Sequence, residues 1–178
     1  MIIYHVSITT ADDYVHRRAA HREAHLARLT ALRQRGFVIG GGPAPDGTSV
    51  DIVYRVQQSE EATRLIEDDP YWTGGAWTAW EPRDFAQFLE PWEMAPVVID
   101  GSRRATIVEG EAPDVEMASF ALIEARGAGR MAFGGFFPDG QMLALMRAAD
   151  PDEAVASLEE TGLWKPATLR ARPLLHVL

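Results

Sequence analysis

The sequence of 178 residues contains no cysteine. This absence excludes disulfide bonds, thiolate nucleophiles and zinc or iron–sulfur sites built on cysteine. No apolar run approaches the ~20 residues that a membrane-spanning helix needs. The first residues, MIIYHVSITTADD, lack the basic start and the small-residue cleavage site of a signal peptide. We therefore expect a protein without a membrane partner, and we place it in the cytoplasm by default.

Basic residues are scarce relative to acidic ones. Seventeen Lys and Arg stand against 26 Asp and Glu, which gives a formal net charge of −9. A charge of this sign repels phosphate backbones and anionic lipids, so nucleic acid is not an expected partner. Hydrophobic residues make up 47% of the chain, which is enough to bury a core at this length.

The chain resembles itself at a fixed offset. The segment Gly41 to Gly47 (GGPAPDG) matches Gly134 to Gly140 (GGFFPDG), 93 positions later. The helix starts SEEA and DPDEA and the pairs Tyr71-Trp72 and Leu163-Trp164 follow in the same order, 92 positions apart. Landmarks that recur in one order at one offset indicate an internal repeat. The sequence therefore predicts two copies of one small unit.

The first copy alternates strand and helix patterns. Its predicted elements are strands at Ile2–Ile8, Phe37–Gly40, Ser49–Val56 and Ala76–Phe85, and helices at Ala11–Arg35 and from Ser59 to about Asp68. Gly36 suits the end of the first helix, Pro70 ends the second, and the segment from Pro43 to Gly47 has turn chemistry. The order β-α-β-β-α-β is that of a ferredoxin-like split βαβ unit.

The second copy follows the same plan with a shorter first helix. Its predicted elements are strands at Ala105–Glu109 and Gln141–Met146 and helices at Val115–Arg126 and from Asp150. Residues 87–104 form a connector in which Val97 to Ile99 is a candidate strand. We predict a unit at residues 1–90, a linker at 91–104 and a degenerate second unit at 105–178. The fold class is α+β, with two ferredoxin-like βαββαβ units fused into a pseudo-dimer of the dimeric α/β-barrel type.

Three motifs in the first copy resemble the YciI-like (YCII-related) family. They are Arg22 to Leu29 (REAHLARL), Gly41-Gly42-Pro43, and Asp69-Pro70-Tyr71 with Gly75 soon after. The resemblance covers about residues 14 to 85. It implies a dimeric ferredoxin-like α/β barrel with a His–Asp pair, which falls on His25 and Asp69. Most members of that family have no assigned reaction, and one is a dehydrochlorinase of a chlorinated hydroxyquinol. The family is often a dimer of single units, whereas this chain would be a monomeric internal pseudo-dimer or a homodimer of it.

The residues themselves point to the same pair. His21, His25, Leu29 and Leu32 follow three- and four-residue steps, so His25 belongs to the core-facing stripe of its helix. An imidazole is the usual proton shuttle near neutral pH. Asp69 is placed at the end of the second helix, where the helix dipole disfavours an acid unless a cation pairs with it. The structural alternative is a histidine that only completes the core, beside solvated acids at a helix end.

The second copy lacks both residues. At the repeat offsets His25 falls on Ala118 and Asp69 on Thr161. A pair needed only for folding would tend to persist in both copies. We therefore expect the chemistry in the first copy, with the second copy as a scaffold or as a part that has repacked.

Other residues are candidates for substrate binding. They are His5, His21, Arg22, Pro43, Ser49, Tyr71 and Trp72. His5 would enter the same pocket from its strand, or would be a hydrogen-bonded core residue. A solvated helix face is predicted for Arg17, Arg18, Arg22 and Arg28, although Arg22 belongs to the family pattern and would then hold an anionic substrate. His21, His25 and Asp69 are also the residue types of a metal site with two histidine ligands and one carboxylate ligand. Nothing else supports a metal, so we expect none and no cofactor.

The leading hypothesis is a cofactor-independent lyase or isomerase for a small aromatic or enolisable compound. His25 would be the general base and Asp69 its partner. The alternative is a non-catalytic small-molecule binding or regulatory module, in which the same pair only bonds a ligand or itself. A third option is a cofactor-free monooxygenase, which rests on analogy of fold alone.

Overall fold

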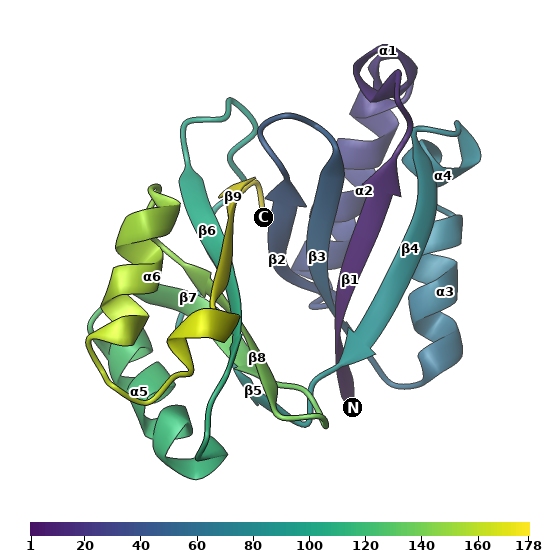
Figure 1. The fold of residues 1–178 in the computed structure, drawn as a ribbon. Helices are drawn as coiled ribbons and strands as arrows, with labels where there is room; N and C mark the ends of the chain where they lie inside the picture. The colour runs from purple at the N-terminus through teal and green to yellow at the C-terminus, as the bar shows by residue number, and fades with distance from the viewer. The chain divides into compact units, whose positions relative to one another are not determined.

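The computed structural model describes residues 1–178, which divide into two compact units. Unit 1 comprises residues 1–84, 95–99 and 176–178, and unit 2 comprises residues 85–94 and 100–175. Each unit is a mixed α and β structure with one antiparallel sheet (Figure 1). No helix is long and apolar enough to cross a membrane.

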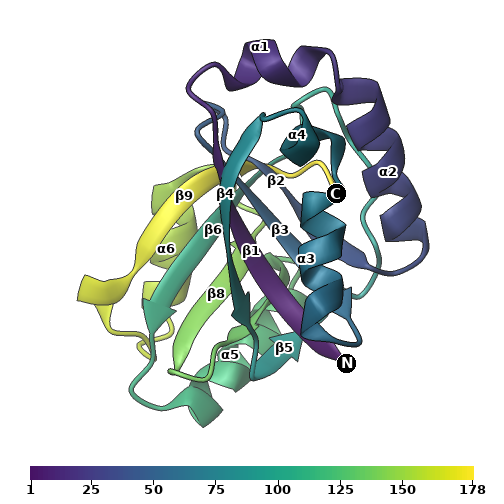
Figure 2. The same ribbon diagram turned by 90° about the vertical axis from the view of Figure 1, so that its right-hand side faces the viewer.

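Unit 1 has a four-stranded antiparallel sheet in the order β2-β3-β1-β4. Its elements are β1 (Ile2–Thr10), α1 (Tyr14–Ala19), α2 (Arg22–Gln34), β2 (Val38–Pro43), β3 (Ser49–Val56), α3 (Ser59–Glu67), α4 (Pro70–Thr73) and β4 (Trp77–Asp84). Val6 and Ile8 of β1 share a buried cluster with Leu29 of α2 and Ile66 of α3. The two helices therefore cover one face of the sheet, as Figure 2 shows. This order is that of a split βαβ unit.

The predicted helix at Ala11–Arg35 is two helices, α1 and α2, with a break at Ala20 and His21. No proline or glycine lies at this break, and the local sequence does not explain it. Gly36 follows the end of α2 with a positive φ of 81°, as predicted for a glycine that ends a helix. The prediction also missed α4, because a single turn of four residues leaves no periodic pattern.

Unit 2 has a five-stranded antiparallel sheet in the order β5-β7-β8-β6-β9. Its elements are β5 (Gln87–Leu89), β6 (Arg104–Glu111), α5 (Val115–Gly127), β7 (Met131–Phe136), β8 (Gln141–Met146), α6 (Pro151–Glu159), a short 3₁₀ turn (Pro166–Thr168) and β9 (Arg170–Leu175). The side chains of Asp114 and Asp150 accept hydrogen bonds from the first turns of α5 and α6. These bonds start both helices where the sequence predicts them.

Equivalent elements of the two units keep the predicted offset. The bounds of α2 and α5, and of β2 and β7, differ by 93 at both ends, and those of α3 and α6 differ by 92. Apart from the added β5, the strand order of unit 2 repeats that of unit 1. The units therefore share one topology, which supports the predicted repeat.

The chain between the units does not form the simple connector that we expected. Residues 87–89 form a strand that pairs with β7, so this segment belongs to unit 2. Val97 to Ile99 is not a strand, although the amide of Val98 donates to the carbonyl of Val177 at 2.8 Å. One hydrogen bond does not make a strand ladder, which explains why the pattern was misleading.

The glycine pairs that begin the two repeated segments lie within strands. Gly41 is in β2, and a Cβ there would lie 2.1 Å from the carbonyl oxygen of Asp51. Gly135 is in β7, and a Cβ there would lie 2.0 Å from the carbonyl oxygen of Gln87. At both positions only glycine lets the neighbouring strand approach so closely.

Candidate functional site

His25 and Asp69 meet inside unit 1, although 44 positions separate them in the sequence. Nδ1 of His25 lies 2.7 Å from Oδ1 of Asp69. The histidine side chain is 8% exposed and the aspartate side chain is fully buried. A buried carboxylate needs partners, and this imidazole is one of them. The two residues that the sequence singled out are thus in direct contact.

The backbone around Asp69 explains its position. Asp69 is the N-cap of α4, and its Oδ1 also accepts a hydrogen bond from the amide of Tyr71 at 2.8 Å. Pro70 occupies the first helical position, where a proline is well tolerated. The expectation that Asp69 suffers from the negative end of a helix dipole was therefore incomplete. The carboxylate also faces the start of α4, where backbone amides stabilise an acid.

Aromatic rings enclose the imidazole of His25. The ring of Tyr71 stacks on it with centroids 3.7 Å apart and planes 10° apart. Trp77 meets it edge-on at 5.2 Å, and Tyr14 meets Tyr71 edge-on at 6.0 Å. Burial raises the pKa of Tyr71 to about 12, with Tyr14 adding to the rise and the nearby Arg18 and Arg22 opposing it. Tyr71 is therefore a neutral phenol at physiological pH.

Arg28 lies beside the same carboxylate. Its Nε is 3.9 Å from Oδ2 of Asp69, and its Nη2 donates to the carbonyl of Leu65 at 3.2 Å. The prediction that Arg28 belongs to a solvated helix face is therefore wrong. The long side chain reaches past α2 to the carbonyl end of α3, where a cation is favoured.

This arrangement fixes the state of the imidazole. Because a carboxylate accepts hydrogen bonds, Nδ1 of His25 carries the proton and donates it to Asp69. In the neutral ring the opposite nitrogen, Nε2, carries the lone pair, and the structure shows no hydrogen bond from the chain to this atom. Such an imidazole can accept a proton at Nε2 while the carboxylate stabilises the cation that forms.

His21 does not join the pair. Its ring packs against α4, so that a Cβ added to Gly74 would lie 2.3 Å from Nε2 of His21. No group of three His, Asp or Glu side chains in the chain has the arrangement of a metal site. The metal alternative therefore has no geometric support.

His5 lies on the other face of the sheet, which corrects the prediction that it enters the same pocket. Val6 and Ile8 face the helices, so the alternation of side chains along β1 turns His5 away from them. Nε2 of His5 lies 2.7 Å from Oδ1 of Asp51, and both side chains are buried. The sequence analysis missed this second His–Asp pair, although the same alternation along β3 would have placed Asp51 on that face.

The remaining candidates are spread over unit 1. Pro43 ends β2 and Ser49 begins β3, and no hydrogen bond or ring contact joins either residue to the His25–Asp69 pair. Arg22 is exposed in the first turn of α2 and lowers the pKa of the nearby Tyr71. Trp72 is partly buried against the core. Of the seven, only Tyr71 contacts the imidazole of His25.

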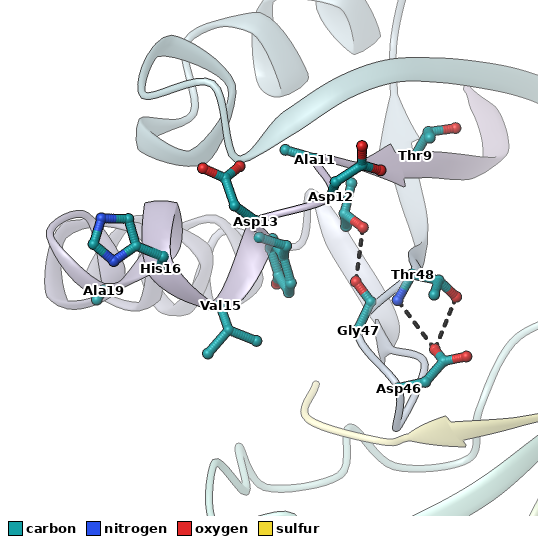
Figure 3. A pocket seen from close by; sticks show the side chains of 12 residues that line it. Thr9, Ala11, Asp12, Asp13, Val15, His16, Ala19, Asp46, Gly47 and Thr48 are labelled. Atoms are coloured by element: carbon teal, nitrogen blue, oxygen red, sulfur yellow. Dashed lines mark hydrogen bonds between the residues drawn. The ribbon is translucent and has the colours of Figure 1, made fainter.

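An open depression of about 840 Å³ lies next to this cluster. It is lined by the end of β1, by α1 with the loop before it, and by the β2–β3 turn (Figure 3). Its charged groups include Asp12, Asp13 and Asp46. Neither His25 nor Asp69 lines it, but Tyr14 does, and Tyr14 contacts Tyr71. The depression is thus separated from the imidazole by two aromatic rings.

Residues 2–86 match the family model of the YCII-related domain. The resemblance that the three motifs predicted is therefore confirmed for the first half of the chain. No curated protein matches the chain.

Three solved structures are similar. A candidate monooxygenase from Lactobacillus acidophilus NCFM has a TM-score of 0.61 at 13% identity, over 99% of this chain and 94% of that one. A second candidate monooxygenase, from Fusobacterium nucleatum, has a TM-score of 0.59 at 8% identity, over 99% and 92%. The 5-chloro-2-hydroxyhydroquinone dehydrochlorinase of Burkholderia phenoliruptrix AC1100, in complex with 2,5-dihydroxybenzoquinone, has a TM-score of 0.40 at 19% identity, over 45% and 89%. At these identities the two full-length matches show a shared α+β fold alone.

Proposed function

We propose that this chain, whose residues 2–86 match the YCII-related domain, is a cofactor-independent acid–base enzyme for a small aromatic or enolisable compound. The main support for this proposal is the buried contact of 2.7 Å between His25 and Asp69. A histidine oriented by a carboxylate is the usual general base of enzymes that need no metal. The proposed reaction is that of a lyase or an isomerase.

In the proposed reaction, Nε2 of His25 removes a proton from an acidic C–H or O–H group of the substrate. The electron pair left behind forms an enolate or expels a leaving group such as chloride. The imidazolium that results is stabilised by the carboxylate of Asp69, and it later returns its proton to the product or to water. Every proton and electron pair is accounted for without a cofactor.

The surroundings of the imidazole favour an anionic or electron-rich ring. Tyr71 and Trp77 offer aromatic surfaces, and the phenol of Tyr71 stays protonated, so it can donate a hydrogen bond. The guanidinium of Arg18 lies 5.0 Å from the Tyr14 ring centroid, on the same cluster. A positive charge nearby stabilises an enolate or phenolate as it forms.

The test is turnover of a panel of small enols, phenols and chlorinated hydroxyquinols, followed by absorbance and by chloride or proton release. With any substrate found, His25→Ala should lower kcat by about 10²–10⁴-fold, as expected for loss of a general base. Glu23→Ala, on the exposed side of the same helix, should leave turnover unchanged. Unchanged turnover in a folded His25→Ala protein would sink the mechanism.

A non-catalytic binding module is the second candidate, and one observation favours it. The depression beside the cluster is not lined by His25 or Asp69, and the imidazole is almost completely buried. In this case the panel would yield ligands that raise the melting temperature but are not converted. His25→Ala would then change only the affinity.

We also propose that the two units arose by duplication and pair their helix-free sheet faces as an internal pseudo-dimer. Support comes from the shared strand order and from the constant offset of the helices. Because the chain has no cysteine, single cysteines introduced in β3 and β8 can carry a pair of spin labels. A broad distribution of long distances between the labels would contradict the pairing.

A further inference from the structure

The helix α5 of unit 2 is apolar on two sides. Its buried residues, Ala118, Ala121, Leu122 and Ala125, face the core of the unit. On the opposite side, between the exposed Glu116 and Glu124, Met117, Phe120 and Ile123 are 49%, 55% and 41% exposed. A surface helix normally carries polar residues on its outer side. Three large apolar side chains three positions apart therefore form a continuous exposed stripe, which we call the α5 stripe.

The equivalent helix of unit 1 shows that the fold does not require this stripe. The exposed residues of α2 are Arg22, Glu23, Ala24, Ala27, Ala31 and Gln34. None of them is a large apolar residue. Both helices start and end at the same repeat positions, so the difference lies in the side chains alone. An exposed apolar patch that a topological equivalent lacks indicates a contact surface.

Trp92 adds a further exposed aromatic ring near the C-terminal end of α5. Its side chain is 69% exposed, and the guanidinium of Arg126 lies over its ring at 3.9 Å. Arg126 is held in turn by a hydrogen bond of 2.7 Å to the carbonyl of Glu90. The indole is therefore fixed beside α5, so its contact with a partner would cost little conformational entropy.

We propose that the α5 stripe binds the α5 stripe of a second copy of this chain, with the two helices antiparallel. Asp114 and Glu116 lie at the N-terminal end of α5, whereas Arg126 lies in its last turn and Arg130 follows it. Antiparallel packing places the acidic end of each helix beside the basic end of the other. The same surface is thus complementary to itself, as a two-fold symmetric interface requires.

Gly127 sets the register of this contact. It lies seven positions after Phe120, so the two residues share one line along the helix, and a Cβ on Gly127 would meet no atom within 4 Å. In the antiparallel pair the ring of Phe120 from one copy occupies this open space on the other. Ile123 and Glu124 then lie near the two-fold axis, and Glu116 comes within reach of the second copy's C-terminal arginines.

The stripe consists of three side chains, so it is smaller than the roughly 800 Å² that each partner buries in a standard interface. We therefore expect a reversible dimer with a Kd of about 1–100 µM. This inference concerns unit 2 and does not depend on the proposed function of unit 1.

Sedimentation equilibrium over about 1–500 µM tests the proposal, since this range brackets the expected Kd. Wild type should shift from monomer to dimer, and Phe120→Asp should weaken the association by at least about tenfold. Ala24→Asp on the equivalent helix α2 is the matched control and should associate like wild type. A wild type that stays monomeric throughout would overturn the proposal and leave the stripe to a different partner.

A second variant distinguishes a lost contact from misfolding of the Phe120→Asp protein. Gly127→Gln fills the open space with a residue that favours helix, so the monomer should be at least as stable while association weakens. Because the chain has no cysteine, Glu124→Cys should form a disulfide-linked dimer on mild oxidation, and Ala24→Cys should not. Equal association of wild type, Phe120→Asp and Gly127→Gln would show that dimers form through another surface, which also overturns the proposal.

Discussion

The two units of this chain place different side chains on the same scaffold. His25 of α2 and Ala118 of α5 hold the same repeat position, and both are buried on the sheet-facing side of their helix. In unit 1 this position carries an imidazole bonded to Asp69, whereas in unit 2 a methyl group packs into an apolar cluster. The topology thus decides that the position faces inward. The side chain decides whether it can do chemistry.

The partner position differs in the same way. Asp69-Pro70 opens the short helix α4 after α3 has ended, while the Asp-Pro pair of unit 2, Asp150-Pro151, lies at a different repeat position and opens α6 itself. At the repeat position of Asp69, Thr161 donates to the carbonyl of Leu158 at 2.7 Å. Unit 2 therefore keeps a polar residue that shapes the turn but has no carboxylate. The extra one-turn helix is what aims an acid at α2.

The largest difference between the units should appear in the unfolding free energy when Asp69 and Thr161 are each replaced by alanine. Asp69→Ala deletes the cap of α4 and leaves the buried polar groups of His25 and Tyr71 without their acceptor. We expect a loss of about 2–4 kcal/mol of unfolding free energy. Thr161→Ala should cost less than about 1 kcal/mol, because water can reach this exposed turn. Urea denaturation of both variants measures the difference, and equal losses would show that Asp69 is only a turn residue.

A smaller loss of stability is expected when a histidine is placed at the equivalent position of unit 2. Ala118 is completely buried, so Ala118→His adds a ring where the core has no space. We expect a destabilisation of about 1–3 kcal/mol from overpacking and no gain of activity. Ala24→His, on the exposed side of α2, serves as the control for a histidine in a helix. An Ala118→His protein as stable as wild type would mean that unit 2 retains a hollow at this position.

The smallest effect concerns the tyrosine beside the imidazole. Burial raises the pKa of Tyr71 from 10 to about 12. Because the folded protein holds this proton more tightly, its contribution to stability is complete below pH 10 and is lost as the pH rises from 10 to 12. Absorbance at 295 nm should show Tyr71 ionising late. In Tyr71→Phe the late step should shrink, and an unchanged titration would contradict the burial of this phenol.

Part of the site followed from the sequence. The spacing of His25, Leu29 and Leu32 is enough to put His25 on the buried side of its helix, because helical periodicity is local. The family motifs then pointed to Asp69. The stacking of Tyr71 on the imidazole did not follow, since it depends on α4, whose single turn has no periodic signal. Arg28 was misplaced because a long side chain can leave the face on which its Cα lies.

The pair of His5 and Asp51 shows a different limit. Each residue lies on a strand that the sequence predicted, yet the prediction placed His5 on the wrong face. Alternation with Val6 and Ile8 is enough to turn His5 away from the helices. Its contact with Asp51 depends in addition on the register of β1 against β3, in which His5 lies opposite Val53 and Ser7 opposite Asp51. Strand register is a long-range property, and a single sequence does not contain it directly.

The sequence by itself indicated an internal repeat, most helices and strands of the first unit, and the absence of both polar residues from the second half. These features are local patterns or comparisons of the chain with itself, and neither needs coordinates. Only the tertiary structure decided that Nδ1 of His25 meets Oδ1 of Asp69 and that Nε2 of His5 meets Asp51 on the opposite face. The physical reason is that a hydrogen bond between distant residues depends on how helices pack on a sheet, to within a fraction of an ångström.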